Sequence, residues 1–121
     1  MLIINSAESS EFLAGDHTLL REVLHPDNNG VDLPFSLALA RIPEGKSSLP
    51  HILKSTEVYI FMAGNGQFYF DDTPKPIGGG DIVVVNPGCN QYVKNTGTGD
   101  LTFYCIVSPK WQPEDEVILT V

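Results

Sequence analysis

Glycine and proline interrupt this chain at short, fairly even intervals, and this punctuation constrains the fold more than any other feature. The runs between the interruptions are rich in Val, Ile, Leu, Phe, Tyr and Thr, which favour β-strands. We expect strands at residues 18–24, 35–42, 57–63, 67–70, 81–86, 92–95 and 101–107. No segment has a helical period of useful length. Many short strands in a chain of 121 residues predict one all-β domain, a sandwich or a barrel.

The turn residues predict how some of these strands are connected. Gly64-Asn65-Gly66 lies between two strand-like runs and is a strong hairpin signal. Residues 95–100, Asn-Thr-Gly-Thr-Gly-Asp, predict a further hairpin loop. Residues 113–119 are expected to form a short helix or a last strand.

Composition excludes several classes of partner. The chain has 15 acidic and 7 basic residues and a formal net charge of −8, with no cluster of Lys or Arg. Binding to phosphates needs such a cluster, so we expect neither nucleic acid nor an anionic membrane as a partner. The start of the chain does not resemble a signal peptide, no run reaches the length of a membrane span, and only two cysteines occur. These features predict a cytoplasmic protein.

Two of the expected strands are apolar on both faces. Residues 58–62, Val-Tyr-Ile-Phe-Met, and residues 82–85, Ile-Val-Val-Val, do not alternate between polar and apolar side chains. A strand with one face in water should alternate, so another layer must cover the outer face. In a chain this short a second subunit is the simplest cover, and we predict a homodimer.

Two linked motifs resemble those of the cupin superfamily. The first family motif is G-x5-H-x-H-x3-E-x6-G, which Gly45, His51, Glu57 and Gly64 match, whereas Leu53 replaces the second histidine. The second is G-x5-P-x-G-x2-H-x3-N, which Gly80, Gly88 and Asn95 match, whereas Asn86 replaces the proline and Gln91 the histidine. The resemblance implies one cupin domain over residues 1–121, a jelly-roll β-barrel with motif one at 45–64 and motif two at 80–95.

The resemblance also places a pocket inside the barrel. It implies that His51, Glu57 and Gln91 are the remaining metal-site positions, where a divalent ion such as zinc, nickel, iron or manganese would bind. Because alternate residues of a strand share a face, Leu53, Tyr59 and Phe61 are expected to line the same space. Cys105, on a strand expected to face inward, is a further candidate lining residue.

Three functions remain open on the sequence alone. The first is a metal-dependent isomerase, lyase or oxygenase in which Glu57 or Tyr59 moves a proton. The second is a module that binds a small sugar-like or acidic molecule without metal or turnover, and the third is a structural or regulatory dimer. The changes at Leu53 and Gln91 weaken a metal site, so we favour a small-molecule-binding protein with a reduced site. In the metal-free alternative, His51, Glu57 and Gln91 hydrogen-bond one another.

Overall fold

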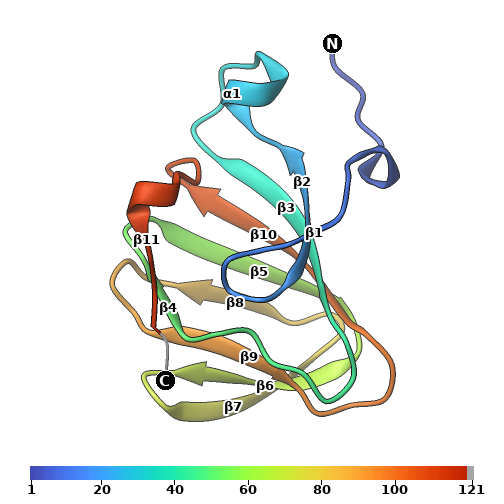
Figure 1. Cartoon of the computed structure of the whole chain (residues 1–121), viewed down its shortest axis with the longest axis vertical. Helices are drawn as coiled ribbons and strands as arrows, with labels where there is room; N and C mark the ends of the chain where they lie inside the picture. The colour runs from blue at the N-terminus through green and yellow to red at the C-terminus, as the bar shows by residue number, and fades with distance from the viewer. Residues whose placement is uncertain (120–121) are drawn as a thin grey trace.

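Two antiparallel sheets form the protein in the computed structural model, which describes residues 1–119 (Figure 1). The first sheet has six strands in the spatial order β1 (Phe12–Leu13), β2 (Leu19–Leu24), β3 (Ser36–Ile42), β10 (Leu101–Ser108), β5 (Thr56–Ala63) and β8 (Ile82–Val85). The second has five, in the order β11 (Glu116–Ile118), β4 (His51–Leu53), β9 (Gln91–Asn95), β6 (Asn65–Phe70) and β7 (Thr73–Gly78). The all-β jelly-roll expectation is confirmed.

Within residues 1–119, helical structure is confined to three short segments. They are a 3-10 turn η1 (Ser6–Glu8), a single-turn α1 (Pro26–Asn29) and a second 3-10 turn η2 (Pro113–Asp115). The segment expected to be a short helix or a last strand therefore contains both, because β11 follows η2 directly. None of the helices formed by residues 1–119 has the length and apolar character needed to cross a membrane.

The glycine-rich turns connect one sheet to the other, and the hairpin prediction for Gly64-Asn65-Gly66 is wrong. β5, before this turn, pairs with β10 and β8, whereas β6, after it, pairs with β9 and β7. The loop at residues 95–100 likewise joins β9 of one sheet to β10 of the other. Gly64 is required where the sheets meet because its φ is +94° and a Cβ there would lie 2.7 Å from the carbonyl oxygen of Asp100.

Alternation of burial along β5, β9 and β10 separates an interior from two outer faces. On β10 the buried side chains are Leu101, Phe103, Cys105 and Val107, and the residues between them are half-buried. The interior is packed with aromatic rings, and Phe61, Phe68 and Phe103 are each at most 1% exposed. This packing removes apolar surface of both sheets from water, and that burial holds the two sheets together.

The interior becomes polar toward one end of β5. Its inward side chains change in order from Phe61, through Tyr59, to Glu57, and all three are buried. Their register partners on β10 are Phe103, Cys105 and Val107, so the polar groups come from β5 and not from β10. A polar site therefore lies at one end of an otherwise apolar core.

Candidate functional site

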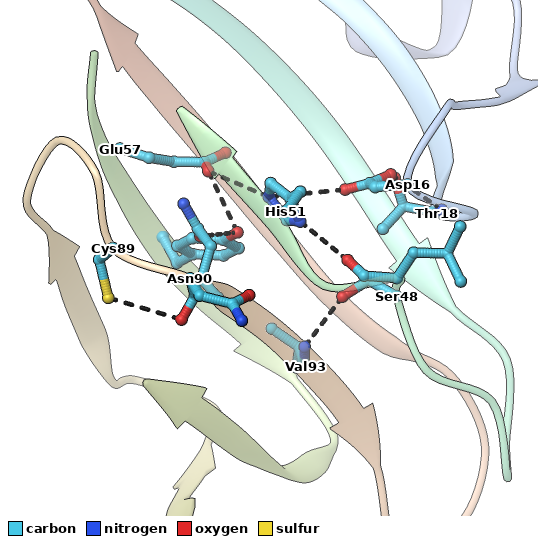
Figure 2. A network of polar contacts seen from close by, with 11 residues as sticks. Asp16, Thr18, Ser48, His51, Glu57, Cys89, Asn90 and Val93 are labelled. Atoms are coloured by element: carbon cyan, nitrogen blue, oxygen red, sulfur yellow. Dashed lines mark hydrogen bonds and ion pairs between the residues drawn. The ribbon is translucent and has the colours of Figure 1, made fainter. Parts of the chain in front are cut away.

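The site is built from two strands that face each other across the interior. His51 begins β4 in the five-stranded sheet, and Glu57 lies on β5 in the six-stranded sheet. The Nε2 atom of His51 lies 3.8 Å from Oε1 of Glu57 and 4.0 Å from Oδ2 of Asp16. Figure 2 shows the imidazole between these two carboxylates. Because His51 is 1% and Glu57 7% exposed, little water screens this contact.

The imidazole is held so that one nitrogen faces the acids. Its Nδ1 atom is 2.9 Å from the carbonyl oxygen of Leu49, which only accepts, so Nδ1 carries a hydrogen and donates it. Nε2 is then the nitrogen that gains or loses a proton beside Glu57 and Asp16. Burial lowers the pKa of His51, but the two carboxylates and the Leu49 carbonyl outweigh burial and raise it to about 9. His51 is therefore a cation at neutral pH.

Tyr59 connects the carboxylate to the amide of Gln91. Its buried hydroxyl lies 3.1 Å from Oε1 of Glu57 and within hydrogen-bonding distance of Oε1 of Gln91. Gln91 is opposite His51 in the register of β9 and β4 and is 1% exposed. Burial and the charge of Glu57 raise the pKa of Tyr59, so its hydroxyl keeps its hydrogen.

Two acids that the motifs do not contain complete the cluster. Asp16 lies in the turn between β1 and β2, where its carboxylate accepts hydrogen bonds from the backbone and hydroxyl of Thr18. Its carbonyl accepts from the Leu49 amide at 2.7 Å, which attaches this turn to the segment before β4. Glu116 is on β11, opposite Leu53. Burial, with the charges of Asp16 and Glu57, raises the pKa of Glu116.

A cavity of about 130 Å³ opens beside this cluster. Tyr59, Cys105 and Trp111 are among the side chains that line it, together with Glu57 and Asp16. Burial raises the pKa of the Cys105 thiol, so this cysteine contributes a neutral, apolar wall. Both Cys89 and Cys105 are free thiols.

The structure separates the residues singled out from sequence into three groups. His51, Glu57 and Gln91 lie together, joined by the His51–Glu57 ion pair and by the Tyr59 hydroxyl. Tyr59 and Cys105 line the cavity. Leu53 and Phe61 are buried, at 2% and 1% exposure, but do not line it.

Asn95, the last residue of the second motif, has a structural role. Its side-chain amide donates to the carbonyl oxygens of Ile42 and Gly99, and its oxygen accepts from the amide of Gly97. The motif asparagine thus fixes the loop that carries the chain from one sheet to the other.

Comparison with known proteins agrees with this architecture. The family model described as the cupin domain matches residues 38–107, more than half of the chain. An oxalate-binding protein from Thermotoga maritima is 29% identical over 92 residues, which cover 75% of this chain and 71% of that protein.

Solved structures share the fold at low sequence identity. A predicted oxalate decarboxylase from Thermotoga maritima has a TM-score of 0.78 at 21% identity and covers 89% of this chain and 99% of its own. The polyketide cyclase RemF from Streptomyces resistomycificus has a TM-score of 0.83 at 13% identity, with 100% and 87% covered. The Streptomyces nucleoside dehydratase Pac13 has a TM-score of 0.78 at 17% identity, with 98% and 91% covered. These likenesses agree with the two-sheet fold, and the match of the cupin domain model to residues 38–107 shows that the chain belongs to the cupin family.

Proposed function

We propose that this cupin binds a small polar molecule in the cavity beside Glu57 and Tyr59. The observation that carries the proposal is a space of about 130 Å³ with apolar walls and a cluster of ionisable groups at one end. An apolar pocket with a few convergent polar groups is the usual form of a small-molecule site. The names of similar proteins point the same way, since one binds oxalate and another was solved with uridine.

Filling the cavity tests this proposal. Ala38 lines the cavity, so the substitution Ala38→Leu would occupy part of it. Ala63→Leu, at an exposed position at the end of β5, adds the same atoms elsewhere. We expect a set of small polar molecules of either charge to include at least one that perturbs the NMR signals of cavity residues in the wild type and in Ala63→Leu but not in Ala38→Leu. Perturbations centred on the stacked pair Tyr69 and Tyr92 instead would overturn the proposal.

A divalent ion at His51, Glu57 and Gln91 is the second candidate. It is favoured by Nε2 of His51, which faces two carboxylates, a donor set that zinc, nickel, iron and manganese accept. The fit is incomplete, because Leu53 supplies no donor atom and Tyr59 already donates to the Gln91 oxygen. Among residues 1–119 no three His, Cys, Asp or Glu side chains are grouped as metal ligands. Our proposal for ligand binding therefore uses no metal.

Metal analysis separates the two candidates. We expect wild-type protein purified without a metal-affinity tag to contain less than one equivalent of metal. The double variant Leu53→His with Gln91→His restores both family positions and should bind zinc or nickel tightly. Stoichiometric metal in the wild type that disappears in His51→Ala would favour the second candidate. No gain of affinity in the double variant would show that the two positions do not face one site.

We also propose that two copies pair through the outer face of the six-stranded sheet. Register places Leu39, Tyr104, Ile60 and Ile82 in one row across this face, and Ile106, Val58 and Val84 in the next. Ile82 and Val84, on the edge strand β8, are 65% and 59% exposed. From β3 to β8 these rows contain no charged side chain, although Arg21 on β2 continues the first row, so the same apolar face of a second copy is a suitable cover.

The oligomeric state tests this pairing. We expect light scattering to give twice the chain mass of 13.2 kDa for the wild type and a single chain mass for Ile82→Glu. Val117→Glu is the matched control, because Val117 is exposed on the other sheet. A wild-type monomer, or dissociation by both variants, would contradict the assignment.

A further inference from the structure

The cavity lining carries charge of one sign. Its carboxylates are Asp16, Glu22, Glu57 and Glu116, and no lysine or arginine is among the described residues that line it. The protonated His51 supplies one positive charge between Asp16 and Glu57. An anionic ligand placed in this space would meet more negative than positive charge at short range, where little water intervenes.

Hydroxyl donors of Thr18, Ser36 and Ser48 also line the cavity, but at its Glu57 end the acceptors outnumber the donors. Tyr59 has one hydroxyl hydrogen for two acceptors, Oε1 of Glu57 and Oε1 of Gln91, so it fully satisfies one of them at a time. The contacts of Glu57 with Tyr59 and His51 both go to Oε1, which leaves Oε2 available to a ligand. A bound molecule that donates hydrogen bonds would relieve this imbalance, and one that only accepts would worsen it.

The remaining lining suits an apolar body next to a positive head group. Trp111, Tyr59 and Phe103 contribute aromatic rings, and aliphatic side chains fill most of the rest. Aromatic faces attract cations, and tryptophan does so most strongly. The volume limits the size of the ligand, since a cavity of roughly 150 Å³ accepts benzene and this one is about 130 Å³.

We infer that the cavity selects a small organic ammonium ion, of roughly six non-hydrogen atoms, over neutral and anionic molecules of the same size. The inference rests on the proposed function and narrows it. It also distinguishes this chain from the oxalate-binding relative, because oxalate is a dianion without a donor.

A ligand series that differs only in its head group tests the inference. Butylammonium, 1-butanol and butyrate share the same apolar chain, and oxalate and zinc chloride are added as two further ligands. Trp111 is the only tryptophan of the chain and lines the cavity, so its fluorescence reports occupancy. We expect butylammonium to bind about tenfold or more tightly than 1-butanol, as for hydrogen bonds to charged groups. Butyrate, oxalate and zinc should give no tighter binding than 1-butanol.

Two variants that neutralise a cavity carboxylate test whether the preference for butylammonium over 1-butanol arises in the cavity. Glu57→Gln and, as a second variant, Asp16→Asn should weaken butylammonium binding about tenfold and leave 1-butanol binding unchanged. Asp72→Asn is the matched control, because it removes one negative charge in an exposed turn between β6 and β7. Circular dichroism identifies any variant that fails to fold.

The outcomes distinguish this inference from the proposal on which it rests. Equal binding of butylammonium and 1-butanol, tighter binding of oxalate, butyrate or zinc, or loss in the Asp72→Asn control would overturn the ammonium inference and leave a binding cavity. If none of the five ligands changes Trp111 fluorescence and the NMR experiment with Ala38→Leu also finds no cavity ligand, the proposed function itself fails.

Discussion

The buried cation His51 makes the stability of this protein depend on pH in a definite direction. Its pKa in the fold is about 9, against 6.5 for the free side chain. Because the folded value is the higher one, the stabilisation is fully present below pH 6.5 and is lost as the pH rises through 9. Each unit of pKa difference corresponds to about 1.4 kcal/mol, so the full contribution is about 3 kcal/mol. About half of it, on the order of 1–2 kcal/mol, is lost between pH 6.5 and 8.

Urea unfolding at these two pH values, at one fixed protein concentration, measures this loss. Glu57 is the strongest of the groups that raise the pKa of His51, so Glu57→Gln should remove most of the pH dependence. Glu11→Gln is the matched control. It removes a carboxylate paired with Arg41, whose guanidinium does not titrate in this range, and it should leave the pH dependence unchanged. The reasoning is refuted if the free energy of unfolding falls equally in the wild type and in Glu57→Gln.

Three further substitutions test the framework around the site through the free energy of unfolding in urea. Asn95→Ala removes three hydrogen bonds of a side chain that is 1% exposed and should cost about 3 kcal/mol, and a cost below about 1 kcal/mol would contradict its structural role. Gly64→Ala should cost about 2 kcal/mol or more, because its new Cβ meets a carbonyl oxygen; Gly30→Ala, with a similar positive φ but open space, should cost about 1 kcal/mol. Equal costs would show that the close approach is unimportant. Tyr59→Phe should cost about 1–3 kcal/mol because it leaves the buried Gln91 oxygen without the Tyr59 hydroxyl donor, and an unchanged midpoint would exclude that bridge.

The backbone requirements of the fold are visible in the sequence because they are local. Gly45, Gly64, Gly80 and Gly88, all at motif positions, each have a positive φ in the structure. A side chain is disfavoured there by its own backbone, whatever the rest of the chain does. Alternation along a strand is equally local, and it placed His51 and Glu57 on inward faces.

Sheet membership could not be predicted in the same way. The turn residues at Gly64 indicate that the chain reverses, but they do not specify which strand the next segment will pair with. β5 pairs with β10, about 40 residues later in the chain, and β6 pairs with β9. A two-sheet arrangement is decided by the packing of distant apolar side chains, and no local pattern records that packing.

The same distinction explains which part of the site the motifs predict. His51, Glu57 and Gln91 occupy motif positions. Three other residues of the site carry no motif signal: Asp16 in the turn between β1 and β2, Trp111 between β10 and η2, and Glu116 on β11. Their placement depends on long-range contacts, such as the bond from the Leu49 amide to the Asp16 carbonyl and the pairing of β11 with β4.

The environment of Leu53 shows how residues outside the motifs affect the charge of the ligand that the cavity selects. The family motif has a histidine here, and this chain has an apolar residue whose register partner on β11 is Glu116. One potential metal ligand has been lost from β4, while a carboxylate has been brought to the cavity from the end of the chain. The motif therefore locates the cavity, but its charge is decided by segments outside the motif. Two cupins with similar motifs can accordingly select ligands of opposite charge, and the acidic turn and strand around His51 favour a cation in this one.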